Sequence, residues 1–213
     1  MKRVINKRIF QFVSLALLAV LTCAAAMAEE YEEGVHYERI VPAQPTSTGD
    51  KVEVLEIFWY GCPHCFRLEP YIERWLRRKP ENAEFVRLPG VFRPSWEVGA
   101  RAYYTAKLLG VFEELHKPLL NAIHLQKRRL NTEDQMRDFF AENGVDKKDF
   151  IKTYNSFAVG TRVRRAKTMT SRYGISGVPA IIVAGKFRLS AQTAGSNAEM
   201  LKIINFLVEK ESK

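Results

Sequence analysis

Apolar side chains along the chain form first a continuous run and then a helical pattern. The segment 51–60 (KVEVLEIFWY) is dense in Val, Ile and aromatic residues, which is typical of a largely buried strand. From Cys62 to Leu76, apolar residues recur at intervals of three and four, which predicts a helix that ends near Lys79-Pro80. Pro70 lies inside this helix, where we expect it to cause a kink without ending the helix.

The segment 83–88 (AEFVRL) predicts a second strand, and a strand–helix–strand succession with such short connections favours parallel pairing through a right-handed crossover. No strand pattern follows until residue 180. Helical patterns separated by Gly and Asn-Gly breaks fill the interval instead, at about 97–110, 112–125, 132–143, 147–155 and 158–173.

The last part of the chain returns to strand patterns. The segments 180–183 and 187–190 flank Ala184-Gly185-Lys186, which predicts a hairpin. Asn197 is a candidate cap for a final helix that runs to about residue 210. The order of elements predicts an α/β protein whose sheet is interrupted by a long helical segment.

The N-terminus has the pattern of an export signal. Four basic residues precede an apolar run at about 12–26, and Ala26-Met27-Ala28 is typical of a cleavage site. We therefore expect residues 1–28 to be a signal peptide, cleaved near Ala28, and the mature protein to be exported. A membrane anchor is the alternative, but the run is shorter than the about 20 residues that span a bilayer. Lipid attachment at Cys23 is a second alternative, for which Thr22 is an unusual neighbour.

Composition and charge narrow the function classes. The chain has 213 residues, 46% hydrophobic and 27% charged, which is the range of a globular protein with a sizeable core. Cleavage after Ala28 would remove four basic and no acidic residues, so that the net charge falls from +9 to +5. No nucleic-acid-binding motif accompanies this modest charge, and we expect no nucleic-acid partner.

The mature chain would carry only Cys62 and Cys65, in the motif Cys62-Pro63-His64-Cys65 at the start of the predicted helix. The helix dipole and terminal amides favour a thiolate at Cys62, and a positively charged or hydrogen-bonding His64 acts in the same direction. Pro63 suits the first helical turn, where its missing N–H costs no bond. We expect Cys62 to be exposed and reactive, and Cys65 to be buried one turn further in.

Two other uses of the cysteine pair are possible. A passive structural disulfide is one, although so small a loop removes little entropy from the unfolded chain. A zinc site is the other, but no second CxxC or paired histidine motif completes four ligands, and we expect no metal.

The segment 58–65 (FWYGCPHC) resembles the active-site segment of the DsbA family of thioredoxin-fold disulfide oxidases. The entry 31–34 (YEEG), the helical stretch and Gly177-Val178-Pro179 also fit that family, so the resemblance covers essentially the whole mature chain. It implies a thioredoxin-like α/β fold with an inserted all-helical domain. We expect the thioredoxin-like domain at 29–93 plus 174–213 and the helical domain at 94–173.

The resemblance also implies roles for single residues. Pro179 would follow a cis peptide bond and face the cysteines, and Val178 would offer its backbone to an incoming peptide. Glu56 would be the buried acidic residue beneath the cysteine pair that tunes it, although a water-facing Glu56 remains an alternative. Glu53 is expected to be the exposed one of the two. The aromatic run 58–60 and the loop 92–96 could line a peptide groove or belong to the core.

We therefore expect a thiol:disulfide oxidoreductase that donates the redox-active disulfide Cys62–Cys65 to exported proteins with free cysteines. Family resemblance implies a periplasmic protein that is reoxidised by a DsbB-like, quinone-linked membrane oxidase and has no tightly bound cofactor. We expect it to be a monomer. A disulfide isomerase or reductase of the same superfamily is the nearest alternative. A non-catalytic, peptide-binding chaperone is an alternative from another class.

Overall fold

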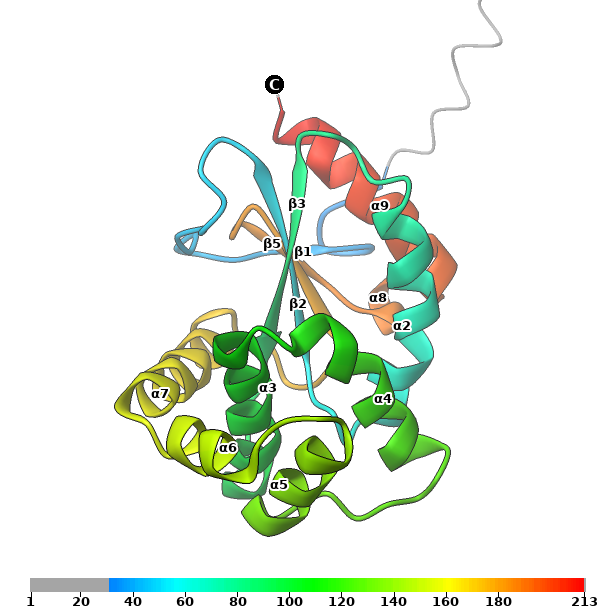
Figure 1. Ribbon diagram of the computed structural model, residues 1–213. Coiled ribbons are helices and arrows are strands. Elements are labelled where there is room, and N and C mark those ends of the chain that lie inside the picture. Colours follow the sequence, from blue (N-terminus) through cyan, green and yellow to red (C-terminus); the bar gives the residue numbers. More distant parts are fainter. Residues whose placement is uncertain (1–30, 213) are drawn as a thin grey trace, which may run out of the picture. The chain divides into compact units, whose positions relative to one another are not determined.

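The computed structural model describes residues 31–212, and the strands and helices of these residues belong to one compact unit that begins at Glu32. Within this unit the strands form one five-stranded mixed sheet in the order β1-β5-β4-β2-β3 (Figure 1). The strands are β1 (Glu38–Arg39), β2 (Val52–Phe58), β3 (Ala83–Pro89), β4 (Ala180–Val183) and β5 (Phe187–Leu189). The predicted signal segment, with Cys23, lies outside the described residues.

Strand β2 lies inside the sheet and organises it. It pairs in parallel with β3, from Val52 opposite Ala83 to Phe58 opposite Pro89, and the helix α2 (Pro63–Leu76) makes the crossover between them. Its other edge pairs antiparallel with β4. The parallel pairing and the β4–β5 hairpin, both predicted from the sequence, are confirmed. The α/β class is confirmed with them.

Helices fill the chain between β3 and β4, as the apolar periodicity predicts. They are the short 3-10 helix η2 (Pro94–Trp96), α3 (Glu97–Leu109), α4 (Phe112–His124), α5 (Glu133–Glu142), α6 (Lys147–Tyr154) and α7 (Phe157–Arg172). Side chains of Thr132, Asp146 and Ser156 cap the last three of these helices by accepting bonds from backbone amides. That residues 94–173 form a domain of their own stays a prediction.

Helices cover both faces of the sheet. On one side, α2 lies beside α9 (Asn197–Lys210), and the indole N–H of Trp75 donates to Asn205 Oδ1 at 2.8 Å (Figure 1). On the other side, Met169 of α7 packs with Leu55 and Ile182 of the sheet. The short helix α8 (Ala191–Ala194) precedes α9. Pro70 remains inside α2, which continues past it to Leu76.

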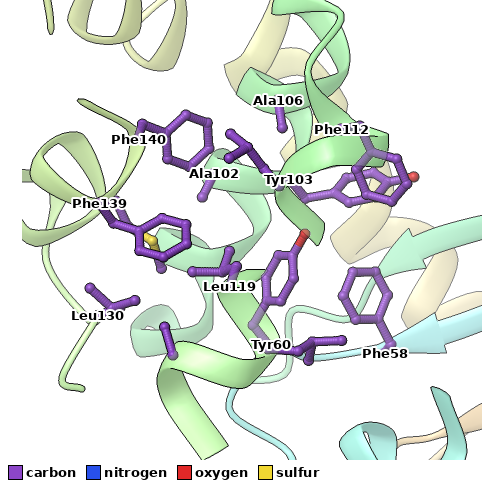
Figure 2. Packing of buried hydrophobic residues seen from close by; sticks show 14 of the residues in the cluster. Phe58, Tyr60, Ala102, Tyr103, Ala106, Phe112, Leu119, Leu130, Phe139 and Phe140 are labelled. Carbon is purple, nitrogen blue, oxygen red and sulfur yellow. The ribbon is translucent and has the colours of Figure 1, made fainter. Parts of the chain in front are cut away.

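The helices α3 to α6 enclose an aromatic core that reaches the end of β2. Figure 2 shows the rings of Phe58 and Tyr60 in the same cluster as Phe139 and Phe140. The full cluster of buried residues also contains both cysteines. The cysteine motif therefore shares one hydrophobic core with the helical segment.

Two expectations about single residues were wrong. Glu53 is 3% exposed, because both faces of the central strand β2 are covered and its carboxylate accepts bonds from the backbone N–H and hydroxyl of Ser47, each at 2.7 Å. The cap of α9 is Ser196, whose hydroxyl accepts from the Glu199 amide at 3.1 Å. Asn197 is the first helical residue instead.

In the part of the chain that the structure describes, no helix is long and apolar enough to cross a bilayer.

Candidate active site

A tight turn after β2 places the cysteine motif. Cys62 is the N-cap residue of α2, with extended φ and ψ of −86° and 117°, and Pro63 begins the helix. The Cys62 amide donates back to the Trp59 carbonyl at 2.9 Å, which closes the turn. A Cβ at Gly61 would overlap the Trp59 indole, so a larger residue at this position would displace that ring. The local sequence thus presents one cysteine at the helix N-terminus.

The two sulfurs are close to each other and differ in their surroundings. Cys62 is 7% exposed and Cys65 is 2% exposed, and both are free thiols. Cys65 is buried as predicted. The expectation that Cys62 is exposed was wrong, because the loop before β4 covers it: the Cys62 thiol donates to the Val178 carbonyl at 3.4 Å. The peptide bond between Val178 and Pro179 is cis, as the family resemblance implied.

The environment favours ionisation of Cys62 and opposes that of Cys65. A hydrogen bond from the Cys65 thiol, together with the Cys65 and His64 amides and the His64 charge, lowers the pKa of Cys62 to about 6 against the opposing effect of burial. Burial, the same hydrogen bond and the charge of Glu56 raise the pKa of Cys65 far above its usual range. Of the two sulfurs, Cys62 is therefore the one whose thiolate form the surroundings stabilise.

Glu56 is buried beneath the motif, at 1% exposure. Burial raises its pKa to about 7, while the adjacent Arg87 acts in the opposite direction. The Arg87 guanidinium donates to Glu56 at 2.9 Å and to Glu69 of α2 at 2.7 Å. The carboxylates of two elements thus share one cation from β3.

Three further residues, Arg87, Glu69 and His116, belong to this site and were not predicted from the sequence. Glu69 and His116 lie on the buried faces of their helices, and an ionisable residue on an apolar helix face is a detectable signal. His116 of α4 contacts Glu69 at 3.4 Å through Nε2, and burial lowers its pKa. Burial would raise the pKa of Glu69, but the bond from His116 and the charge of Arg87 lower it overall.

The exposed side of the motif borders a cavity of about 440 Å³. His64 and Arg67 line it on the α2 side, and the guanidinium of Arg67 donates to His64 Nδ1 at 2.8 Å. Val178 and Pro179 line it on the loop side, and Gln192 lies on α8. Three of the predicted residues, His64, Val178 and Pro179, therefore line one opening, and Cys62 contacts the Val178 carbonyl beside it.

The aromatic residues near the motif divide between the two expected roles. Phe58 and Tyr60 are core residues, at 2% and 3% exposure. Trp59 is half-buried and stacks on Trp96, with ring centroids 4.3 Å apart, and Phe92 packs against the edge of that pair at the surface. Only the second group is available to a ligand.

No group of three or more His, Cys, Asp or Glu side chains within residues 31–212 is arranged to hold a metal ion.

Comparison with known proteins agrees with this geometry. The sequence model of the family described as DSBA-like thioredoxin domain matches residues 86–201 of this chain. The thiol:disulfide interchange protein DsbA of Pseudomonas aeruginosa is 40% identical over 203 residues, covering 93% of this chain and 96% of that protein. The protein of the same name from Pseudomonas syringae pv. tomato is 37% identical over 201 residues, covering 93% and 94%.

Solved structures show the same likeness. The crystal structure of Pseudomonas aeruginosa DsbA superposes with a TM-score of 0.81 at 40% identity, over 86% of this chain and 96% of that one. The crystal structure of the oxidoreductase DsbA from Xylella fastidiosa superposes with a TM-score of 0.77 at 30% identity, over 83% of this chain and 95% of that one. The chain belongs to the family of DSBA-like thioredoxin domain proteins.

Proposed function

We propose that this thiol:disulfide oxidoreductase donates a disulfide, formed by Cys62 and Cys65, to proteins that fold after export. The observation that carries the proposal is the N-cap position of Cys62, where the Cys65 thiol and the amides of His64 and Cys65 lower its pKa to about 6. A stabilised thiolate favours the dithiol form of the protein. The corresponding disulfide is then a strong oxidant.

The chemistry is two successive thiol–disulfide exchanges. A substrate thiolate attacks Cys62 Sγ, the Cys62–Cys65 bond breaks, and the Cys65 sulfur leaves and takes up a proton. The second substrate thiolate then attacks the substrate sulfur of the mixed disulfide, and Cys62 leaves as a thiolate. Two electrons pass from the substrate thiols to the cysteine pair, and a substrate disulfide is formed.

The remaining site residues assist these steps. Pro63 sets the helix entry, and His64 and Glu56 tune the two sulfurs. The Val178 backbone, next to Pro179, would pair with an extended substrate segment lying in the adjoining cavity. Support for this comes from the Val178 carbonyl, which already lies 3.4 Å from Cys62 Sγ and lines the same opening as His64.

The reduced protein must be reoxidised to act again. We propose that a DsbB-like, quinone-linked membrane oxidase does this in the periplasm, that the protein works there as a monomer, and that it needs no tightly bound cofactor. The names of the relatives support a disulfide interchange role.

The equilibrium with glutathione tests the proposal. The reduced protein should dominate at glutathione ratios that leave a thioredoxin-like protein oxidised, and a dithiol peptide should be oxidised stoichiometrically. Cys62→Ser should abolish peptide oxidation while the fold is retained. A thioredoxin-like equilibrium constant would favour a reductase or isomerase, and peptide binding that survives in Cys62→Ser without any oxidation in the unsubstituted protein would favour a chaperone.

A further inference from the structure

Tyr60, two residues before Cys62, is held at both ends by one helix. Its backbone carbonyl lies 2.7 Å from His124 Nε2, and its hydroxyl lies 3.0 Å from His116 Nδ1. Both histidines belong to α4, in the helical segment between β3 and β4. The turn that leads into the cysteine motif is therefore attached to a helix whose contacting residues lie 56 and 64 positions further along the chain.

His124 contacts both flanks of the motif. A carbonyl oxygen can only accept, so His124 Nε2 carries the proton of the bond to Tyr60. The same imidazole stacks on the ring of Phe66, the residue after Cys65, with centroids 4.9 Å apart and planes 17° apart. A single half-buried side chain thus restrains the residues on either side of the segment 62–65.

His116 completes the attachment from inside the core. Its Nε2–H faces Glu69 Oε2 at 3.4 Å, which leaves Nδ1 of the neutral ring to accept from the Tyr60 hydroxyl. Burial lowers the pKa of His116 and raises that of Tyr60, which keeps both groups in these states. The Tyr60 ring lies in the aromatic cluster beside Phe58 (Figure 2). Tyr60 is consequently an anchor for the turn and is not open to substrate.

We propose that His124 is a positioning residue for Cys62. By holding the Tyr60 carbonyl and the Phe66 ring, it fixes the turn and the first helical residues so that the His64 and Cys65 amides point at the Cys62 sulfur. Loss of this restraint lets the turn relax and weakens the stabilisation of the thiolate. The inference rests on the proposed function, since it concerns the acidity of the same sulfur.

The test compares three substitutions in the full-length mature protein. His124→Ala removes the donor and the ring, His124→Phe keeps the stacking ring without the donor, and His124→Gln keeps a side-chain N–H donor. His36→Ala is the matched control, because His36 accepts a local bond from the Glu32 amide and lies apart from the motif in the chain. For each variant, the thiolate absorbance of the dithiol form is titrated and the equilibrium with glutathione is measured.

We expect His124→Ala and His124→Phe to lower the ionisation constant of Cys62 by about threefold or more, the size of effect that loss of one hydrogen bond produces. The glutathione equilibrium should shift by a similar factor toward the disulfide form. In His124→Gln, the Cys62 ionisation constant and the glutathione equilibrium should both lie close to those of the unsubstituted protein. His36→Ala should match the unsubstituted protein in both.

The outcomes separate the two proposals. If His124→Ala and His124→Phe have the same lowered Cys62 pKa as the unsubstituted protein, even where their thermal stability is reduced, the positioning role is overturned. The proposed function would then still stand. An ordinary Cys62 pKa in the unsubstituted protein would overturn the proposed function itself. If His124→Ala does not fold, the comparison of His124→Phe with His124→Gln decides the question.

Discussion

The Cys62 thiol donates to the carbonyl oxygen of Val178, 116 positions further along the chain, at 3.4 Å. This contact joins the helix N-terminus, where the reactive sulfur lies, to the loop that enters β4. A carbonyl can accept from the thiol but offers nothing to a thiolate. Ionisation of Cys62 therefore exchanges this contact for the bonds from Cys65 and the helix amides.

The Cys65 thiol should have a measurable effect on the acidity of Cys62. Cys65→Ala removes the hydrogen bond that contributes most to the lowered pKa of Cys62, whereas Cys65→Ser keeps a hydroxyl donor at that position. The pH dependence of Cys62 alkylation should therefore have its midpoint near 6 in the unsubstituted protein, move to higher pH in Cys65→Ala, and remain low in Cys65→Ser. Equal midpoints in the two variants would contradict this assignment.

The stability of the dithiol protein should depend on pH with a definite sign. The folded-state pKa of Cys62, about 6, is below its ordinary value of 9.0, so the folded protein binds fewer protons than the unfolded chain between these values. The free energy of unfolding should rise with pH across this window, and the gain should be lost as pH falls through about 6. Cys62→Ser, measured by urea denaturation, should lack the increase.

Glu56 should produce the opposite trend. Its folded-state pKa of about 7 lies above the ordinary 4.5, so its favourable contribution is present at low pH and is lost as pH rises through 7. Glu56→Gln removes this titration. The free energy of unfolding of the variant, minus that of the unsubstituted protein, should therefore be more positive at pH 8 than at pH 5. If this difference is the same at both pH values, the raised pKa is refuted.

Arg87 balances two buried carboxylates, and its removal should be severe. Arg87→Met leaves Glu56 and Glu69 without their shared cation, which should cost about 3–5 kcal/mol in the free energy of unfolding. Because the cost arises from uncompensated charge, adding Glu56→Gln to Arg87→Met should recover part of it. Denaturant unfolding of the single and double variants measures the coupling, and additive losses would show that the charges act independently.

The helical core should contribute stability through packing. Phe150 is fully buried, and its ring lies 4.8 Å from that of Phe140. Phe150→Ala should destabilise the protein by about 3–5 kcal/mol through lost burial and the cavity left behind. Phe157, at 84% exposure, is the matched control, and its replacement by Ala should change stability by no more than about 0.5 kcal/mol.

The β4–β5 hairpin should require glycine at position 185. Gly185 has a φ of 65°, and a Cβ there would overlap the Gln44 carbonyl. Gly185→Ala should thus destabilise the protein by well over about 1 kcal/mol. Gly144→Ala separates the two causes, because Gly144 has a φ of 89° but open space around its Cα. If the two variants lose equal stability, the overlap with Gln44 has no effect.

Local pattern was sufficient for most elements and for the reactive cysteine. The periodicity of apolar residues predicts α3 as 97–110 and α5 as 132–143, within one residue of their observed bounds, because a helix needs only contacts three and four positions apart. The lowered pKa of Cys62 follows equally from nearby sequence, since the Cys65 thiol and the amides of Cys65 and His64, which stabilise the thiolate, lie within three residues of it. The cap of α9 was misplaced by one position, because Ser196 and Asn197 are both good capping residues.

Tertiary structure alone decided the partners of the buried carboxylates and the distant atoms that lie near the Cys62 sulfur. The burial of Glu53 depends on Ser47 folding over one face of β2, and the environment of Glu56 depends on Arg87, 31 positions away. The cover over Cys62 and the bond from His124 to Tyr60 span longer separations still. Periodicity reports only which face of an element is apolar. The partner that a side chain contacts across the core is set by how distant segments pack. The charged side chains of this site are paired across such contacts between distant segments.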